Sequence, residues 1–169
     1  MQSRYGLFAA ALLLASCAAP PKPVELANAP ILPLALDSDF EFRKVKRFLN
    51  QPEQFQPTEN EKINFERRRV NFGALSADER RQREGTYFDF FWRAKWGADL
   101  TVRLEYRQAK LGNAVRAQEV AYEQAKGSVK TSFAVIGDNY LWDGPVTAWR
   151  CLLIENGRIV AFTQSYLWK

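Results

Sequence analysis

The alternation of large apolar residues from position 85 onward most constrains what this chain can fold into. Successive side chains of a β-strand point to opposite faces, so an apolar residue at every second position predicts a half-buried strand. Two runs show this pattern: Phe88, Phe90, Trp92, Ala94 and Trp96, and then Leu100, Val102, Leu104 and Tyr106. We therefore expect two strands here, each with one face in a hydrophobic core.

The segment Gly97-Ala98-Asp99 between the two runs predicts a turn. A three-residue loop keeps both apolar faces on one side and pairs Trp96 with Leu100, whereas a two-residue loop places Leu100 opposite Lys95. Because the buried faces decide the register, we expect a direct hairpin with a three-residue loop.

The end of the chain carries the clearest hairpin signal. Strands at 146–155 and 158–168 flank Asn156-Gly157, the strongest two-residue turn signal. Pairing across this turn places Ile154 opposite Ile159 and Cys151 opposite Phe162. Both faces are apolar near the turn, so we expect a cover over the second face, either the chain's own N-terminal segment or another protein.

Residues 38–84 form a basic lead-in that we expect to be partly helical. Ser38-Asp39-Phe40-Glu41 and Ser76-Ala77-Asp78-Glu79 have the capping-box pattern, so each predicts the start of a short helix. Between them, the alternation from Ile63 to Phe72 predicts a strand.

Weaker alternation at 114–122 and 129–135 predicts two more strands, which brings the total to about seven. Seven strands at this spacing predict an all-β fold, an antiparallel β-sandwich with short N-terminal helices, loosely similar in architecture to immunoglobulin domains. The alternative is an α+β fold whose helices pack on one curved antiparallel sheet. Either fold makes residues 38–169 a single globular domain, with an aromatic-rich β region at 85–169.

The N-terminus has the features of a secretion signal. Arg4 precedes an apolar run at 5–14, which is too short to span a membrane, since a transmembrane helix needs about 20 residues. Residues 1–16 are therefore expected to be a signal peptide that is removed.

The signal ends in Leu14-Ala15-Ser16-Cys17, which resembles the lipobox of bacterial lipoproteins. The resemblance implies cleavage before Cys17 and attachment of diacylglycerol and an N-acyl chain to that residue. Ala18 follows in place of Asp, which in that family favours delivery to the outer membrane, facing the periplasm. Residues 17–37, with five of the eight prolines, then predict an extended tether whose end at 31–36 docks on the domain.

The chain contains no histidine, which excludes Ser-His and Cys-His nucleophile pairs and histidine metal sites. It also lacks a glycine-rich phosphate loop and a cysteine cluster. We therefore expect no catalytic residues, no metal and no cofactor apart from the lipid on Cys17.

The loop at 137–144 is the best candidate for ligand binding. Tyr140 and Trp142 are aromatic residues of the kind that stack on sugars, and Asp138 and Asp143 are a carboxylate pair. The pair suggests calcium binding or a carboxylate-dependent hydrolase, but Asp beside Gly is more often a turn residue. Glycan or peptidoglycan binding is thus the alternative function, and hydrolysis a remote one.

The last hairpin is the best candidate for a protein interface. Its candidate residues are Trp149, Cys151, Phe162, Tyr166 and Trp168. If Cys17 carries lipid, Cys151 has no partner within the chain, so it is either a small buried hydrophobe, which its neighbours favour, or paired with another chain.

The basic clusters could meet an envelope polyanion, but nearby acids favour a solvated surface, and a tethered envelope protein rarely meets nucleic acid. We therefore expect a lipid-anchored, non-catalytic protein that acts in interaction or scaffolding with an envelope protein partner.

Overall fold

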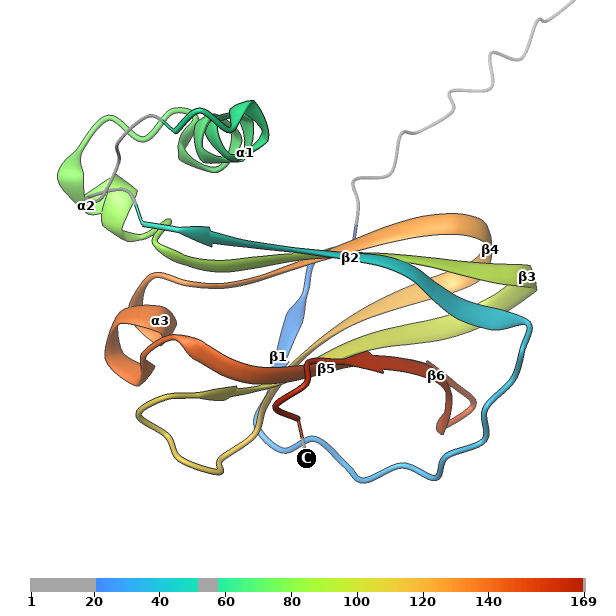
Figure 1. Ribbon diagram of the computed structural model, residues 1–169. Helices are drawn as coiled ribbons and strands as arrows, with labels where there is room; N and C mark the ends of the chain where they lie inside the picture. Colours follow the sequence, from blue (N-terminus) through green and yellow to red (C-terminus); the bar gives the residue numbers. More distant parts are fainter. Residues whose placement is uncertain (1–20, 52–57, 169) are drawn as a thin grey trace, which may run out of the picture.

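The computed structural model describes residues 21–51 and 58–168. The signal peptide and Cys17 lie outside the described residues. The elements are β1 (Val24–Leu26), β2 (Phe40–Asn50), α1 (Glu61–Asn71), α2 (Ala77–Arg81), β3 (Gly85–Gln108), β4 (Arg116–Ile136), α3 (Asp138–Asp143), β5 (Val146–Glu155) and β6 (Arg158–Gln164) (Figure 1). The all-β prediction is confirmed, since the six strands form one antiparallel sheet and the helices are short.

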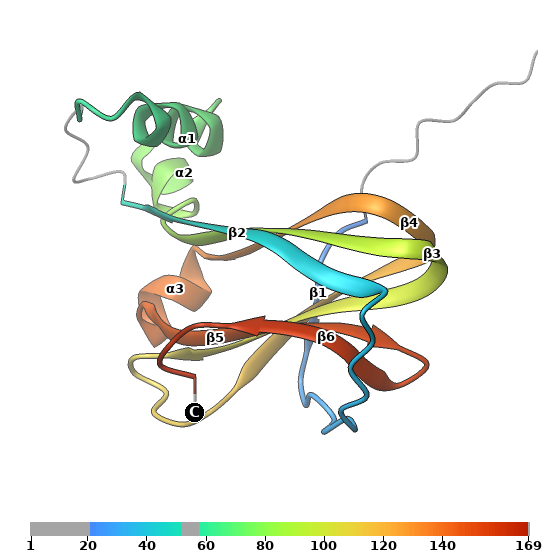
Figure 2. The same cartoon turned by 45° about the vertical axis from the view of Figure 1, so that its right-hand side comes forward.

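The sheet bends across its two longest strands, so that its two halves face each other (Figures 1 and 2). The first part of β3 pairs with β2, the second part pairs with β5, and β4 follows β3 along both parts. We call β2 with residues 85–94 and 127–136 the upper layer. The lower layer consists of β1, β5, β6 and residues 100–108 and 116–122. The two layers thus belong to one curved sheet. A single curved antiparallel sheet was part of the alternative α+β prediction.

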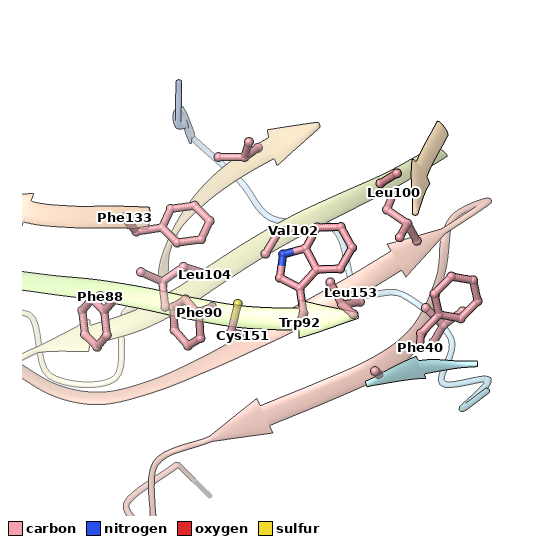
Figure 3. Packing of buried hydrophobic residues seen from close by; sticks show 14 of the residues in the cluster. Phe40, Phe88, Phe90, Trp92, Leu100, Val102, Leu104, Phe133, Cys151 and Leu153 are labelled. Carbon is pink, nitrogen blue, oxygen red and sulfur yellow. The ribbon is translucent and has the colours of Figure 1, made fainter. Parts of the chain in front are cut away.

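The core lies between the two layers (Figure 3). The ring of Trp149, on β5, lies with its centroid 5.7 Å from that of Phe88 and 5.5 Å from that of Phe90, both on β3. The ring centroids of Trp92 and Tyr122 lie 5.3 Å apart in an edge-to-face arrangement. The indole N–H of Trp92 donates a hydrogen bond of 2.8 Å to the Thr131 hydroxyl. The two apolar runs of β3 therefore line the core, as their alternation predicts, except for Trp96, which is 42% exposed.

The predicted hairpin at Gly97-Ala98-Asp99 is wrong. The chain does not reverse there; the pairing of β3 with β4 is irregular between Ala94 and Leu100 and then resumes. Ala98 is buried in the core, which a tip of a hairpin would not be. The turn signal marks a bend within one long strand.

The predicted strands at 114–122 and 129–135 are likewise two parts of β4. Gln124 and Gly127 have φ of 46° and 79°, which is irregular backbone for a strand. They lie where β4 bends along with β3. The count is therefore six strands instead of seven.

In residues 38–84 the sequence predicts a helix where the structure has a strand, and a strand where the structure has a helix. The predicted helix after Ser38 is β2, whose alternation is broken by a bulge between Phe42 and Lys44. The predicted strand from Ile63 to Phe72 is α1, where the Asn60 side chain accepts hydrogen bonds from the first-turn N–H groups. The second capping box is confirmed in α2, where Ser76 and Glu79 cap each other.

The last hairpin is confirmed with its turn at Asn156-Gly157, and Ile154 lies opposite Ile159 as predicted. A bulge between Leu153 and Ile154 shifts the pairs further from the turn by one position. Phe162 therefore lies opposite Leu152 instead of Cys151. Because one position changes the face, Phe162 points away from the core.

The described part of the predicted tether belongs to the domain: its end at 31–36 docks on β6 as expected, whereas the pairing of residues 24–26 in the sheet was not expected. β1 pairs with β4, and the N–H groups of Ala35 and Asp37 donate to carbonyls of β6 at 2.9 Å. Leu32 packs on the apolar outer face of β5 and β6. The chain's own N-terminal segment thus covers the second face of the last hairpin.

Candidate interaction surfaces

The predicted ligand loop forms the short helix α3 at one end of the sheet. Gln108, at the end of β3, donates its amide N–H groups to the carbonyls of Asn139 at 2.7 Å and Gly144 at 2.9 Å. The Asn139 amide also donates to the carboxylate of Glu25 in β1 at 2.7 Å. These contacts hold α3 firmly against the sheet.

The two aromatic residues of this loop do not form one platform. Tyr140 is only 7% exposed, and burial raises the pKa of its phenol, whereas Trp142 is 75% exposed. Tyr140 therefore belongs to the protein interior, which corrects its assignment as a binding residue. Trp142 alone is presented to a ligand.

The two carboxylates of the loop lie at opposite ends of α3. Asp143 forms a 2.6 Å ion pair with Arg116, and Asp138 accepts a 3.4 Å hydrogen bond from Gln82. Among the described residues, no three Asp, Glu or Cys side chains are grouped so that they could hold a metal ion. The two carboxylates thus have separate structural partners and do not converge on one substrate.

The predicted interface residues divide into buried and exposed ones. Cys151 is free and completely buried, Trp168 is also buried, and Trp149 is half-buried in the core. The structure therefore corrects the prediction that these three residues form an interface, because a partner cannot reach them directly. Phe162 and Tyr166 are 42% and 90% exposed, so both are available to a partner.

Four charged side chains form a network on the outer face of the lower layer. Arg103 pairs with Glu119 on one side and lies 3.6 Å from Glu105, which accepts a 2.6 Å hydrogen bond from Arg150. Arg103 and Glu105 are almost fully buried, although their positions on an alternating strand predict a solvated face. The N-terminal segment covers them, and the Pro30 carbonyl accepts a 2.8 Å hydrogen bond from Arg103.

The C-terminal residues close the same face. The guanidinium groups of Arg107 and Arg150 lie 4.8 and 5.0 Å from the centroid of the Trp168 ring, a cation–π arrangement. The Ser165 N–H donates to the Trp149 carbonyl at 2.8 Å. The segment around Pro30 and residues 165–168 are therefore both fixed on the outer face of the lower layer.

This arrangement exposes large apolar side chains from the segment before β2 and from β6 and the residues after it. We call them the docking face: Ile31, Leu34, Phe162, Tyr166 and Leu167, all at least two-fifths exposed. The segment after Pro30 and the C-terminus lie on the lower side in both views (Figures 1 and 2). Aromatic and aliphatic side chains presented on a rigid frame are typical of protein interfaces.

A second surface was missed in the sequence. A cleft of about 380 Å³ separates α1 from the upper layer, between Ile63 and Glu66 of the helix and Val45, Arg47 and Tyr87 of the strands. The cleft was missed because the α1 segment was predicted as a strand. The Asn60 cap followed by Glu61 was the available signal for a helix.

No protein family, no curated protein and no solved structure matches this chain. In the part of the chain that the structure describes, no helix is both long and apolar enough to cross a membrane. The function has to come from the chain's own surfaces.

Proposed function

We propose that this chain is a lipid-anchored protein of the bacterial envelope, tethered to the outer membrane and facing the periplasm, whose domain binds another envelope protein. The single observation that carries the binding role is the docking face, where five large apolar side chains stand exposed around a buried ionic network. The role needs no catalytic group.

The rigidity of the docking face supports this role. Leu32 and Trp168 are packed against the sheet, so their exposed neighbours are held in place before any partner arrives. Side chains that are already ordered lose less conformational entropy on binding. The buried charges beneath them do not need to be desolvated again.

The lipid anchor is proposed from the lipobox at residues 14–17. Acyl chains on Cys17 would give stable attachment, because two or three chains hold a protein where one is marginal. A lipid on Cys17 would keep the protein in the envelope, so its partner is expected to be an envelope protein.

The second candidate function is glycan binding through Trp142. One observation favours it, the 75% exposure of this residue beside the firmly held α3. The burial of Tyr140 leaves a single stacking ring, which weakens this candidate relative to the docking face.

A photo-crosslinking amino acid at Tyr166 or at Trp142 tests both candidates in intact cells. We expect the probe at Tyr166 to give one protein adduct of discrete mass, and the probe at Trp142 to give none. A glycan adduct at Trp142 without a protein adduct at Tyr166 would contradict the proposal and favour the second function.

A double substitution tests whether the contact is specific. In Ile31→Ser with Leu167→Ser, we expect the adduct at Tyr166 to disappear while the thermal midpoint stays unchanged, because both side chains are exposed. Trp142→Ser, also at an exposed residue, is the matched control and should leave the adduct in place.

A further inference from the structure

We propose that the outer face of α1 and the loop after it rest on an anionic membrane surface, as a second contact beside the acyl chains of Cys17. This inference deepens the proposed function and rests on its lipid anchor. It concerns a surface on the side of the molecule away from the docking face.

Helix α1 has two apolar sides. Ile63 and Val70 face the sheet, with Ile63 lining the cleft and Val70 buried. Positions three, four and seven apart share one side of a helix. The side away from the sheet has this spacing and lines one shallow hollow: Phe65, Arg68, Arg69 and Phe72.

The outer side carries large apolar groups that nothing in the described chain covers. Phe65 is 58% exposed, Phe72 is 85% exposed, and Leu75 in the following loop is 86% exposed. Such groups at the end of an amphipathic helix are typical of segments that lie in the interface of a bilayer.

Arginines accompany these apolar groups. Arg68 has no ion-pair partner among the described residues, Arg69 pairs with Glu66 at 2.8 Å, and Arg80 donates to the Leu75 carbonyl at 3.5 Å. The nearby Glu79 carboxylate accepts the N–H groups of Leu75 and Ser76 and is turned toward the backbone. Arginine beside exposed phenylalanine complements anionic headgroups above acyl chains.

The helix is held in a fixed position on the sheet. Asn50, at the buried end of β2, exchanges amide hydrogen bonds of 3.1 and 2.9 Å with Asn71. Asn50 also donates to the Arg83 carbonyl at 2.8 Å, and the Arg83 guanidinium donates to the Val70 carbonyl at 3.3 Å. The outer face is thus presented in one orientation.

The chain between the proposed lipid and the domain is short, which keeps the domain close to the membrane. Three residues, Ala18 to Pro20, separate Cys17 from Pro21, and an extended chain gains about 3.3–3.6 Å per residue. Cys17 therefore lies within about 14 Å of Pro21. In both views the described chain begins above the sheet, on the side toward which α1 and α2 project but to the right of them (Figures 1 and 2). A membrane is the occupant that this short distance favours over a protein.

The test uses the lipidated full chain, reconstituted into vesicles with or without phosphatidylglycerol in phosphatidylcholine. A polarity-sensitive fluorophore is attached to Ala77→Cys, next to the loop. The new thiol reacts selectively, since Cys151 is buried and Cys17 is blocked by lipid. We expect the emission of this fluorophore to shift to the blue and to be quenched by quenchers placed in the bilayer, but only when the vesicles contain phosphatidylglycerol. Phe72→Ser with Leu75→Ser should abolish both, and Arg68→Gln should lower the embedded-to-exposed ratio about fivefold.

Two controls match these changes. The same label at Arg158→Cys, on the β5–β6 turn of the lower layer, should remain in water. Tyr166→Ser with Leu167→Ser removes two exposed apolar residues elsewhere and should leave the signal at position 77 unchanged.

The outcomes separate the inference from the anchor. Protein that floats with the vesicles while the label at 77 stays in water overturns the inference and leaves the anchor standing. Protein that does not float carries no lipid, which overturns the anchor and this inference with it. A label that responds only to added envelope proteins and never to vesicles assigns the face to a protein partner and overturns the inference.

Discussion

Cys151 is a free cysteine that lies in the core. Its side chain lies in the core between those of Phe90 and Trp92 in Figure 3, and burial raises the pKa of the thiol well above its usual value. The thiolate is the reactive form, so this group is both inaccessible and in its unreactive form. Pairing of Cys151 with another chain would require the sandwich to open.

Thiol labelling measures that protection. We expect Cys151 in the folded protein to resist a maleimide at neutral pH and to react fully once urea unfolds the chain, because the reagent needs an exposed thiolate. Labelling at equal rates in both conditions would contradict the buried position. The Ala77→Cys variant is the control for reagent activity, since Ala77 is exposed.

Tyr106 makes stability depend on alkaline pH. Burial is the main cause that raises the pKa of its phenol from 10.0 to about 12. The unfolded chain releases this proton near pH 10 and the folded chain only near pH 12, so the stabilisation is complete below pH 10 and is lost as pH rises toward 12. The free energy of unfolding should fall by up to about 3 kcal/mol across this window.

Urea unfolding at the two ends of the window checks this expectation. Tyr87, Tyr122 and Tyr140 also have raised pKa values, so the wild-type loss contains their contributions. Tyr106→Phe should lose less stability over the same interval, and an identical loss in both proteins would assign it to other groups.

The N-terminal segment is an element that the sequence alone did not reveal. β1 has only three residues and lies among prolines, so composition indicated a spacer. The segment is fastened through Arg103, which holds the Pro30 carbonyl and pairs with Glu119. Removing one member of a buried ionic network leaves the others without compensation.

Arg103→Met should therefore lower the free energy of unfolding by about 3–5 kcal/mol and expose the N-terminal segment to proteases. Denaturant unfolding and limited proteolysis measure the two effects. Arg93→Met, an identical change at an exposed position of the same strand, should change stability by less than about 0.5 kcal/mol. Equal effects of the two changes would mean that the network is not what holds the segment.

The elements also show why sequence prediction succeeded only in part. Alternation correctly identified the residues of β3 that face the core, apart from the exposed Trp96, because burial follows the strand period directly. It did not distinguish a turn from a bend at Gly97, since both use the same residue types and only the distant partner strands decide. The bulge in β2 hid its alternation, and the bulge in β5 moved Phe162 to the outer face, where it became available for binding.

At the scale of the whole molecule, the two proposed surfaces lie on opposite sides. The chain start and α1 are on the upper side, while the docking face is on the lower side (Figures 1 and 2). A domain held close to a membrane by its upper side would present the docking face to the periplasm. Phe162 and Tyr166 were both predicted as interface residues, but the outward position of Phe162 depends on the bulge in β5, which the sequence did not reveal. The burial of Trp168 could not be predicted either, since it depends on two arginines from other strands.

This proposed polarity requires a lipid on Cys17, so Cys17→Ser is the decisive whole-molecule change. Each buried methylene of an acyl chain contributes about 0.8 kcal/mol to the free energy of membrane binding. Two or three whole chains therefore contribute far more than the apolar side of one short helix. We expect the variant to leave the membrane pellet after carbonate extraction and to lose the Tyr166 adduct through loss of co-localisation. Because Asp after the lipidated cysteine retains lipoproteins of this kind at the inner membrane, Ala18→Asp should keep the lipid but move the protein to the inner-membrane fraction of a density gradient. Cys17→Ser protein that still partitions wholly with membranes would refute the anchor, and the α1 surface would then have to account for attachment by itself.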